Sequence, residues 1–285
     1  MLRLHGSFHM HLFSSVFARL LIAVFSVALA ATAVAAETLK ARYSVSLVGL
    51  HIGEIGFETR LEQANYKVDL NAHLTGVASW IAHVKMALAS SGQIRGGTVL
   101  PSAYATTSAN SDTTRTLRMS LNAGTVRAVD ISPPFDDFEG RVPVTAANKH
   151  NILDPMSALI MAVPPGHPLV GPAACNRTIP IYDGLVRFDL DLSFVGTRDV
   201  SAAGYSGPVS VCAVRYRPIA GHKVDSKSTA FMAQNREIEI WLAPIEPAHV
   251  VVPFRVALAT LAGYTEVEAT EFAIDSDHIT ARRDH

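Results

Sequence analysis

Residue types suited to catalysis or metal binding are sparse in this sequence. Asp136, Asp137 and Glu139 form its densest carboxylate group, and paired carboxylates can act as general acid and base or bind a cation. Proline and glycine flank this group at Pro133-Pro134 and Gly140, and both residue types favour a solvated turn. We therefore interpret the three carboxylates as part of a surface loop.

The remaining motifs of enzymes and cofactor proteins are missing. No histidine beyond residue 35 has H-x-H or H-E-x-x-H spacing, the local patterns of a zinc site. The chain also lacks a G-x-S-x-G elbow and a glycine-rich phosphate loop. Its formal net charge of −1, without a cluster of Lys and Arg, argues against nucleic acid as a partner. We predict no metal and no cofactor, although a catalytic site assembled from distant residues stays open.

Residues 1–35 have the features of a secretory signal peptide. Arg3 and Arg19 precede an apolar run from Leu20 to Leu29, and Ala33-Val34-Ala35 is a small-x-small cleavage site. The run is shorter than the roughly 20 apolar residues of a membrane-spanning helix. We predict cleavage near Ala35 and a periplasmic location in a cell with two membranes, with an uncleaved anchor as the alternative.

The two cysteines fit this exported location. Cys175 and Cys212 are the only cysteines of the chain, and in exported proteins two cysteines usually pair. We predict a disulfide between them that encloses the Asp183-Gly184 dipeptide, itself a strong hairpin signal. The alternative, a catalytic or redox thiol, lacks a C-x-x-C motif.

Period-two alternation predicts strands for most of the remaining chain. Apolar residues at Tyr66, Val68 and Leu70 alternate with polar ones, and the segment from Phe188 to Phe194 repeats this pattern. A change of phase near Ala269-Thr270 predicts a bulge in the last strand.

One segment differs from the strands. Asp154 is suited to an N-cap, Pro155 to the first helical position, and Pro164-Pro165 to the end of a helix. The residues between are apolar on nearly all sides, which is typical of a buried helix. We predict a helix over Asp154–Val163.

These elements predict a mainly β fold. We expect a curved antiparallel sheet, or incomplete barrel, with the short central helix packed on its concave face. The expected organisation is a signal peptide (1–35), a single β-rich domain (36–274) and a flexible tail (275–285).

Five short stretches also carry a resemblance to a known family. They are Tyr43 with Gly49-Leu50-His51-Ile52-Gly53, Gly97-Thr98-Val99-Leu100-Pro101-Ser102-Ala103-Tyr104, Asp154-Pro155-Met156-Ser157-Ala158-Leu159, Tyr182-Asp183-Gly184, and Trp241-Leu242 before Pro253. In these stretches the chain resembles the DUF3108 family of uncharacterised exported bacterial proteins, over most of residues 40–274. Its strand–helix–strand order is similar to that of the LolA/LolB lipoprotein carriers, which wrap a curved sheet around a helix-plugged hydrophobic cavity.

Compartment, fold and resemblance predict a non-enzymatic periplasmic protein of the cell envelope that binds an apolar ligand, a lipid or part of a lipoprotein. The expected cavity is lined by Trp80, Met156, Leu159, Ile160 and Phe188. Two alternatives stay open: an adaptor that binds another envelope protein through a sheet edge or the Trp241 face, and a hydrolase of envelope polymers.

The signal-peptide prediction can be tested directly. Intact-mass measurement of protein isolated from the periplasm should give a chain that begins at or near Ala36 or Glu37. Full-length protein in the membrane fraction would contradict it.

Overall fold

The computed structural model describes residues 36–62, 64–76, 78–81 and 84–277. The predicted signal peptide and residues 278–285 of the predicted tail lie outside this part of the chain. The described residues belong to one compact unit.

Strands dominate this unit. They are β1 (Ala36–Leu47), β2 (Leu50–Glu62), β3 (Asn65–Leu74), β4 (Lys85–Arg95), β5 (Thr98–Ala109), β6 (Thr114–Asn122), β7 (Thr125–Ser132), β8 (Met161–Ala162), β9 (Arg177–Tyr182), β10 (Arg187–Ala202), β11 (Tyr205–Ala220), β12 (Ile238–Ile245), β13 (Val250–Thr260) and β14 (Gly263–Asp277). The helical segments are α1 (Ala78–Ile81), α2 (Pro172–Cys175), α3 (Lys227–Gln234) and the 3₁₀ turns η1 (Ala147–Lys149) and η2 (Ser157–Leu159).

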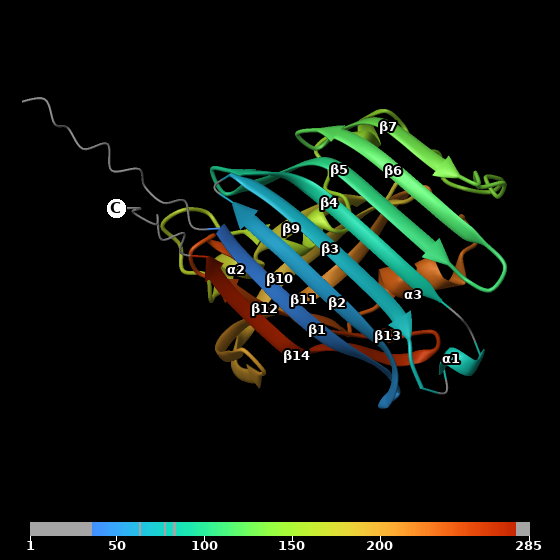
Figure 1. Ribbon diagram of the computed structural model, residues 1–285. Helices are drawn as coiled ribbons and strands as arrows, with labels where there is room; N and C mark the ends of the chain where they lie inside the picture. Colours follow the sequence, from blue (N-terminus) through green and yellow to red (C-terminus); the bar gives the residue numbers. More distant parts are fainter. Residues whose placement is uncertain (1–35, 63, 77, 82–83, 278–285) are drawn as a thin grey trace, which may run out of the picture. The chain divides into compact units, whose positions relative to one another are not determined.

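The strands form one antiparallel sheet that curves but does not close. Its order is β7-β6-β5-β4-β3-β2-β1-β14-β13-β12-β11-β10-β9, and β8 pairs with β13 outside this path. Strands β7 and β9 are thus the two edges, while the first and last strands, β1 and β14, pair along their whole length in the middle. The curvature brings β1–β7 to face β9–β13 (Figure 1). The predicted fold class, a mainly β incomplete barrel, is confirmed.

The alternating pattern correctly predicted the buried face of β3, but not all of β10, where Asp189 was expected to face outward and is buried. In β3, Tyr66 and Val68 are buried in the core, while Lys67 between them is exposed. The predicted bulge also occurs, because Arg42 pairs with Glu271 and Tyr43 pairs with Ala269, which leaves Thr270 as the extra residue.

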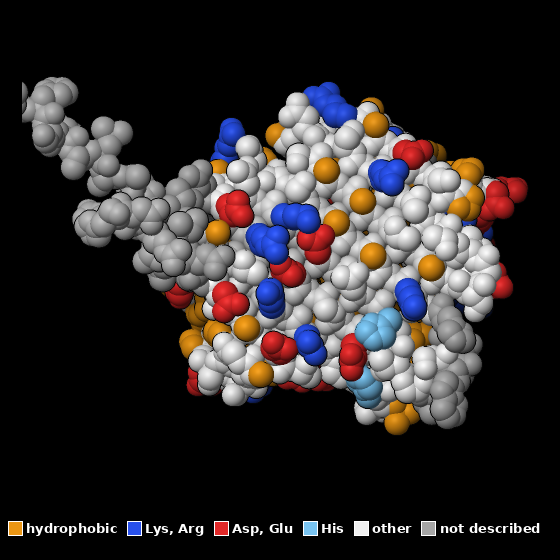
Figure 2. Space-filling view, in the orientation of Figure 1, with side chains coloured by type: hydrophobic (Ala, Val, Ile, Leu, Met, Phe, Trp, Pro, Cys, Tyr) orange, Lys and Arg blue, Asp and Glu red, His pale blue; other side chains and the backbone are white. Residues whose placement is uncertain are grey.

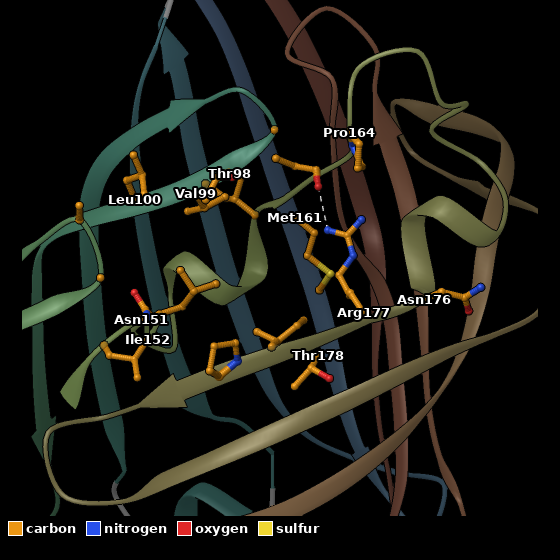
Figure 3. Close-up of a pocket in the computed structure, with 18 of the residues that line it drawn as sticks. Thr98, Val99, Leu100, Asn151, Ile152, Met161, Pro164, Asn176, Arg177 and Thr178 are labelled. Carbon is orange, nitrogen blue, oxygen red and sulfur yellow. Dashed lines mark hydrogen bonds between the residues drawn. The ribbon is translucent and has the colours of Figure 1, made fainter. Parts of the chain in front are cut away.

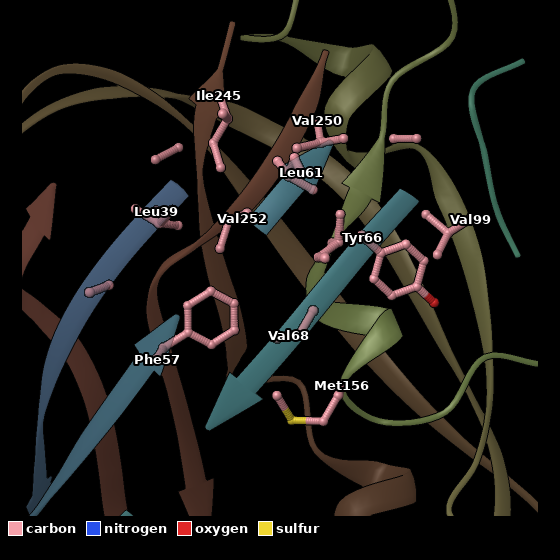
Figure 4. Close-up of a cluster of buried hydrophobic side chains, with 14 of the residues drawn as sticks. Leu39, Phe57, Leu61, Tyr66, Val68, Val99, Met156, Ile245, Val250 and Val252 are labelled. Carbon is pink, nitrogen blue, oxygen red and sulfur yellow. The ribbon is translucent and has the colours of Figure 1, made fainter. Parts of the chain in front are cut away.

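A hydrophobic core fills the space between the two halves of the sheet. Leu39, Phe57 and Val68 from the first half face Ile245, Val250 and Val252 from the second, with Met156 between them (Figure 4). Burial of this apolar surface is the main force that holds the halves together.

The outward face of β1–β7 has a different character. It carries Lys and Arg mixed with Asp and Glu, and its hydrophobic side chains are scattered (Figure 2). Such a face is typical of a surface in contact with water.

The prediction of a helix over Asp154–Val163 is wrong. The segment lies on the concave face and is buried as expected, but only Ser157–Leu159 forms a 3₁₀ turn. The chain then extends, and Met161 and Ala162 pair with Val251 and Val250 of β13. Hydrogen bonds to a neighbouring strand thus replace helical ones. The extended form also lets Ile160 and Met161 enter two different core clusters, which explains why the segment is apolar on all sides.

The start of this segment spans the gap between the two halves of the sheet. The Ile152 N–H donates to Gly124 O in the β6–β7 turn (3.0 Å), and Leu153 exchanges backbone hydrogen bonds with Pro180 and Tyr182 of β9. The turn residue must be glycine, because Gly124 has a φ of +78° and a Cβ there would lie 3.0 Å from Ile152 O. We call residues 151–163 the crossing segment.

A buried polar cluster anchors the crossing segment to the sheet. The Asp154 carboxylate is fully buried and accepts hydrogen bonds from the backbone N–H groups of Met156 and Ser157, both at 3.0 Å. It also accepts from the hydroxyls of Ser157 and of Ser90 on β4. Tyr66 on β3 completes the cluster, with its hydroxyl 2.7 Å from that of Ser157. Met156, not Asp154 as predicted, is the N-cap of the short turn, but the Asp154 carboxylate fixes the start of the turn and ties it to two strands.

Helix α3 was not predicted. Ser226 is its N-cap and accepts from Thr229 N, a signal visible in the sequence. The helix has no buried residue, so it lacks the apolar periodicity by which helices are usually recognised.

Replacing Asp154 should destabilise the protein strongly. Asp154→Ala leaves buried N–H and O–H donors without an acceptor, which should cost about 3 kcal/mol or more of unfolding free energy. Asp154→Asn keeps one acceptor oxygen and should cost less. Urea titration of the two variants and the wild type would measure both effects, and wild-type stability of Asp154→Ala would refute the anchoring role.

The same pair of proteins gives a pH test. Burial raises the pKa of Asp154 above its ordinary 3.8, although its hydrogen bonds partly offset this. The folded state therefore holds the proton more tightly than the unfolded state. Relative to Asp154→Asn, the wild type should lose stability as the pH rises from about 4 through the folded-state pKa. A stability difference independent of pH in this range would contradict the assignment.

Candidate functional site

A pocket of about 400 Å³ opens beside the free edge of β9 (Figure 3). The β4–β5 and β6–β7 turns form one wall, the crossing segment the second, and α2 with β9 the third. The lining residues are Gly97, Thr98, Val99, Leu100, Ala123, Gly124, Asn151, Ile152, Leu153, Ile160, Met161, Ala162, Pro164, Ala173, Asn176, Arg177, Thr178, Ile179 and Pro180. We call it the edge pocket.

The incomplete closure of the sheet creates this pocket. The crossing segment pairs with β9 only near Leu153 and with β13 only at Met161 and Ala162. Between these points, no residue in the described ranges pairs with the outer edge of β9 at Thr178. The walls consist mainly of aliphatic side chains and prolines, which suit an apolar ligand.

Arg177 is the single ionisable residue among the lining residues. It is half-buried as the first residue of β9. Its guanidinium donates to the backbone oxygens of Ala162 (2.8 Å) and Ala173 (2.6 Å), and Figure 3 shows it beside Met161. Burial lowers its pKa and no carboxylate offsets this effect, but an arginine stays protonated at neutral pH.

The predicted disulfide between Cys175 and Cys212 is confirmed. It joins the end of α2 to β11, with the Cα atoms 5.5 Å apart. Both cysteines are fully buried. Because Arg177 follows Cys175 by two residues, the disulfide also fixes the wall that carries the guanidinium.

The residues predicted to line a cavity do not come together. Ile160 lines the edge pocket, whereas Met156 is buried in the main core. Leu159 packs against that core. Phe188 packs against a second core cluster, which includes Met161 and Ile179, and its ring centre lies 5.2 Å from that of Tyr216. Trp80 belongs to α1, but its side chain lies outside the described part of the structure.

The prediction failed here because it assumed a helix. Helical spacing would place Met156, Leu159 and Ile160 on one face, but the extended chain after Leu159 separates them. The residues that form the edge pocket come from turns and a strand edge, and no sequence signal distinguishes Arg177 from other arginines.

Within the carboxylate group of Asp136, Asp137 and Glu139, the structure places two cations beside Asp137. Asp137 forms ion pairs with Lys223 (2.8 Å) and Arg141 (3.6 Å), and the Lys223 hydrogen bond lowers its pKa. This loop is exposed, as predicted. Among the described residues, no group of three or more His, Cys, Asp or Glu side chains could hold a metal ion.

One group on the outer face has the residue types of a catalytic triad. The Ser44 hydroxyl lies 2.8 Å from His51 Nδ1, but the Thr75 hydroxyl takes the other ring nitrogen at 2.9 Å and Glu54 stays 4.0 Å away. The hydrogen bond that the histidine of a triad donates to a carboxylate, and that orients its ring, is therefore absent from this group. Figure 2 shows the histidines of this face beside an acidic side chain.

The Trp241 face is not an open apolar surface. The indole N–H donates to Glu239 (2.6 Å), and the guanidinium of Arg255 stacks over the ring at 4.6 Å from its centre. The ring is partly buried, so this arrangement stabilises the strand surface.

A family model described as a protein of unknown function (DUF3108) matches residues 42–270. The chain belongs to this family. The match covers every strand that surrounds the edge pocket and confirms the resemblance seen in the sequence. A search of curated proteins finds no match.

A solved structure shares the DUF3108 chain's fold. It is the beta-barrel-like protein of the domain of unknown function DUF1849 from Brucella abortus, with a TM-score of 0.51 and 9% sequence identity. The similarity covers 85% of this chain and 98% of that one. At this identity it shows a common fold only.

None of the helices in the described ranges is long and apolar enough to cross a membrane.

Removing the disulfide should lower stability. Cys212→Ala opens a crosslink between residues 37 positions apart, which should cost roughly 3–4 kcal/mol of unfolding free energy. Urea titration should give the same loss for wild-type protein treated with a reductant. Equal stability of the oxidised wild type and the variant would show that the bond is not formed in solution.

Proposed function

We propose that this DUF3108 protein is a non-enzymatic, exported protein of the cell envelope that binds an apolar ligand, a lipid or the acyl part of a lipoprotein, in the edge pocket. The observation that carries the proposal is the pocket itself. Its lining is mainly aliphatic, and its volume of about 400 Å³ falls within the range of roughly 300–1,000 Å³ for small-molecule sites.

Two features support export to the periplasm. The Cys175–Cys212 disulfide would persist in an oxidising compartment but is rare in the cytosol. The apolar run Leu20–Leu29 followed by Ala33-Val34-Ala35 is typical of a secretory signal peptide.

The pocket is suited to binding because most of its apolar wall is already in place. Leu153 and Pro180 present part of their surface to the pocket. A backbone hydrogen bond of 2.7 Å between them holds both in place, so binding would not have to order them. A preformed site avoids the entropy cost of ordering side chains. Met161 adds an adaptable thioether to the wall.

A pocket-filling variant tests the proposal. Thr98 is exposed at the start of β5 and lines the pocket, so Thr98→Trp should occupy part of its volume without removing a core side chain. We expect delipidated wild-type protein to bind a fluorescent fatty-acyl probe saturably, and Thr98→Trp to weaken this binding about tenfold or more, the effect of losing roughly 1.4 kcal/mol of contact.

Thr107→Trp is the matched control. Thr107 is exposed on the same strand and lies outside the edge pocket, so its replacement should leave the affinity unchanged. Absence of saturable binding by folded wild-type protein would refute the proposed function, and equal weakening by both variants would place the probe elsewhere.

An exposed apolar patch favours the adaptor as a second candidate function. Val48, Leu50, Leu261 and Tyr264 are each about half or more exposed. They lie in or beside the β1–β2 and β13–β14 turns, which are joined by a hydrogen bond from Val48 N–H to Tyr264 O (2.7 Å). Contiguous exposed apolar residues often mark a protein interface. If this patch is an interface, Leu50→Ser with Leu261→Ser should abolish crosslinking to an envelope partner in cells and leave acyl-probe binding intact.

A further inference from the structure

We propose that the ligand of the edge pocket is a single acyl chain that ends in a carboxylate, and that Arg177 binds this carboxylate. The inference rests on the proposed function and adds the chemical class of the ligand.

The charge balance of the pocket is the first argument. Arg177 is its one ionisable lining residue, and among the described side chains no Asp or Glu forms an ion pair with it. A cation removed from water is costly unless an anion or several acceptors compensate for the lost hydration. An anionic ligand would supply the missing charge, whereas a neutral one would leave it uncompensated.

The hydrogen bonds of Arg177 provide the second argument. Its two bonds to Ala162 O and Ala173 O fix the guanidinium in the wall but use only part of its donors. The remaining donors are available to a ligand. A planar guanidinium binds a carboxylate through parallel hydrogen bonds, which are stronger than bonds between neutral groups.

The layout of the pocket provides the third argument. Figure 3 shows Arg177 beside Met161, with Asn176 near it and Ile152 on the other side of the pocket. Asn176 and Thr178, the neighbours of Arg177 in the chain, are exposed. The side of the pocket that carries Arg177 is therefore polar and accessible to solvent. A carboxylate at Arg177 would direct its chain along the partly exposed side chains of Pro180 and Leu153.

The volume favours one chain. A pocket of about 400 Å³ is near the lower end of the range for small-molecule sites, which suits a single acyl chain better than an intact diacyl lipid. The carboxylate head also distinguishes the ligand from a neutral acyl ester.

Ligands that differ only in the head group test the inference. Isothermal titration of delipidated protein at pH 8, below the micelle concentrations, would compare dodecanoate, dodecanol and dodecyl phosphate. We expect wild-type protein to bind dodecanoate roughly tenfold or more tighter than dodecanol, the advantage of a charge-assisted hydrogen bond. Dodecyl phosphate should bind more weakly than dodecanoate.

Variants at Arg177 separate recognition from structure. Arg177→Met has a similar length and no charge, and should bring the dodecanoate-to-dodecanol preference to one or below while dodecanol still binds. Arg177→Lys should retain part of the preference. Arg118→Met removes a positive charge from the exposed face of β6 and should leave the preference unchanged.

The outcomes distinguish the two proposals. Binding of neither dodecanoate nor dodecanol by folded wild-type protein would overturn the proposed function. Equal binding of both, or a preference that survives in Arg177→Met, would overturn the role of Arg177 and leave an apolar pocket. Tighter binding of dodecyl phosphate would overturn the assignment of a carboxylate.

Discussion

Burial of the hydrophobic core holds the two halves of the fold together, and the buried carboxylate of Asp154 fixes how they are placed relative to each other. The edges of the sheet, β7 and β9, do not pair with each other, so the sheet alone cannot fix the distance between its halves. The crossing segment does this, and it can lie in the core only because its backbone and hydroxyl groups find acceptors there. Asp154 accepts from four donors, including Ser90 of β4. A buried polar group that is fully paired specifies one arrangement, because any other would leave donors unsatisfied.

The edge pocket follows from this mode of closure. A continuous strand between β7 and β9 would fill the gap with backbone hydrogen bonds. The crossing segment instead touches β9 near Leu153 and then moves to β13 at Met161, which leaves an apolar space between the two contacts. The disulfide next to Arg177 holds the outer wall of that space. The same constraint therefore explains the stability of the incomplete barrel and the presence of the edge pocket.

Sequence patterns predicted the parts that local physics determines. The alternation around Val68, the bulge at Thr270 and the cysteine pair each depend on residues close in the chain or on compartment, and all three are confirmed. The helix over Asp154–Val163 was wrong because capping residues predict how a turn begins but not whether a neighbouring strand competes for the following residues. The pocket could not be predicted, since its walls meet only through long-range topology. Arg177 stands out only once the structure places it in the wall of that pocket.

The pairing of β1 with β14 has a consequence for how the protein is made. Ala36 pairs with Asp277, so the central seam of the sheet joins the two ends of the described chain. Within β1–β7 and within β9–β13, each strand pairs with its neighbour in the sequence, so each half can form as it is synthesised. The pairing of β1 with β14 forms only when the last strand is present. Contacts between such distant residues slow folding. The native sheet is thus complete only after the final strand has been synthesised and has reached β1.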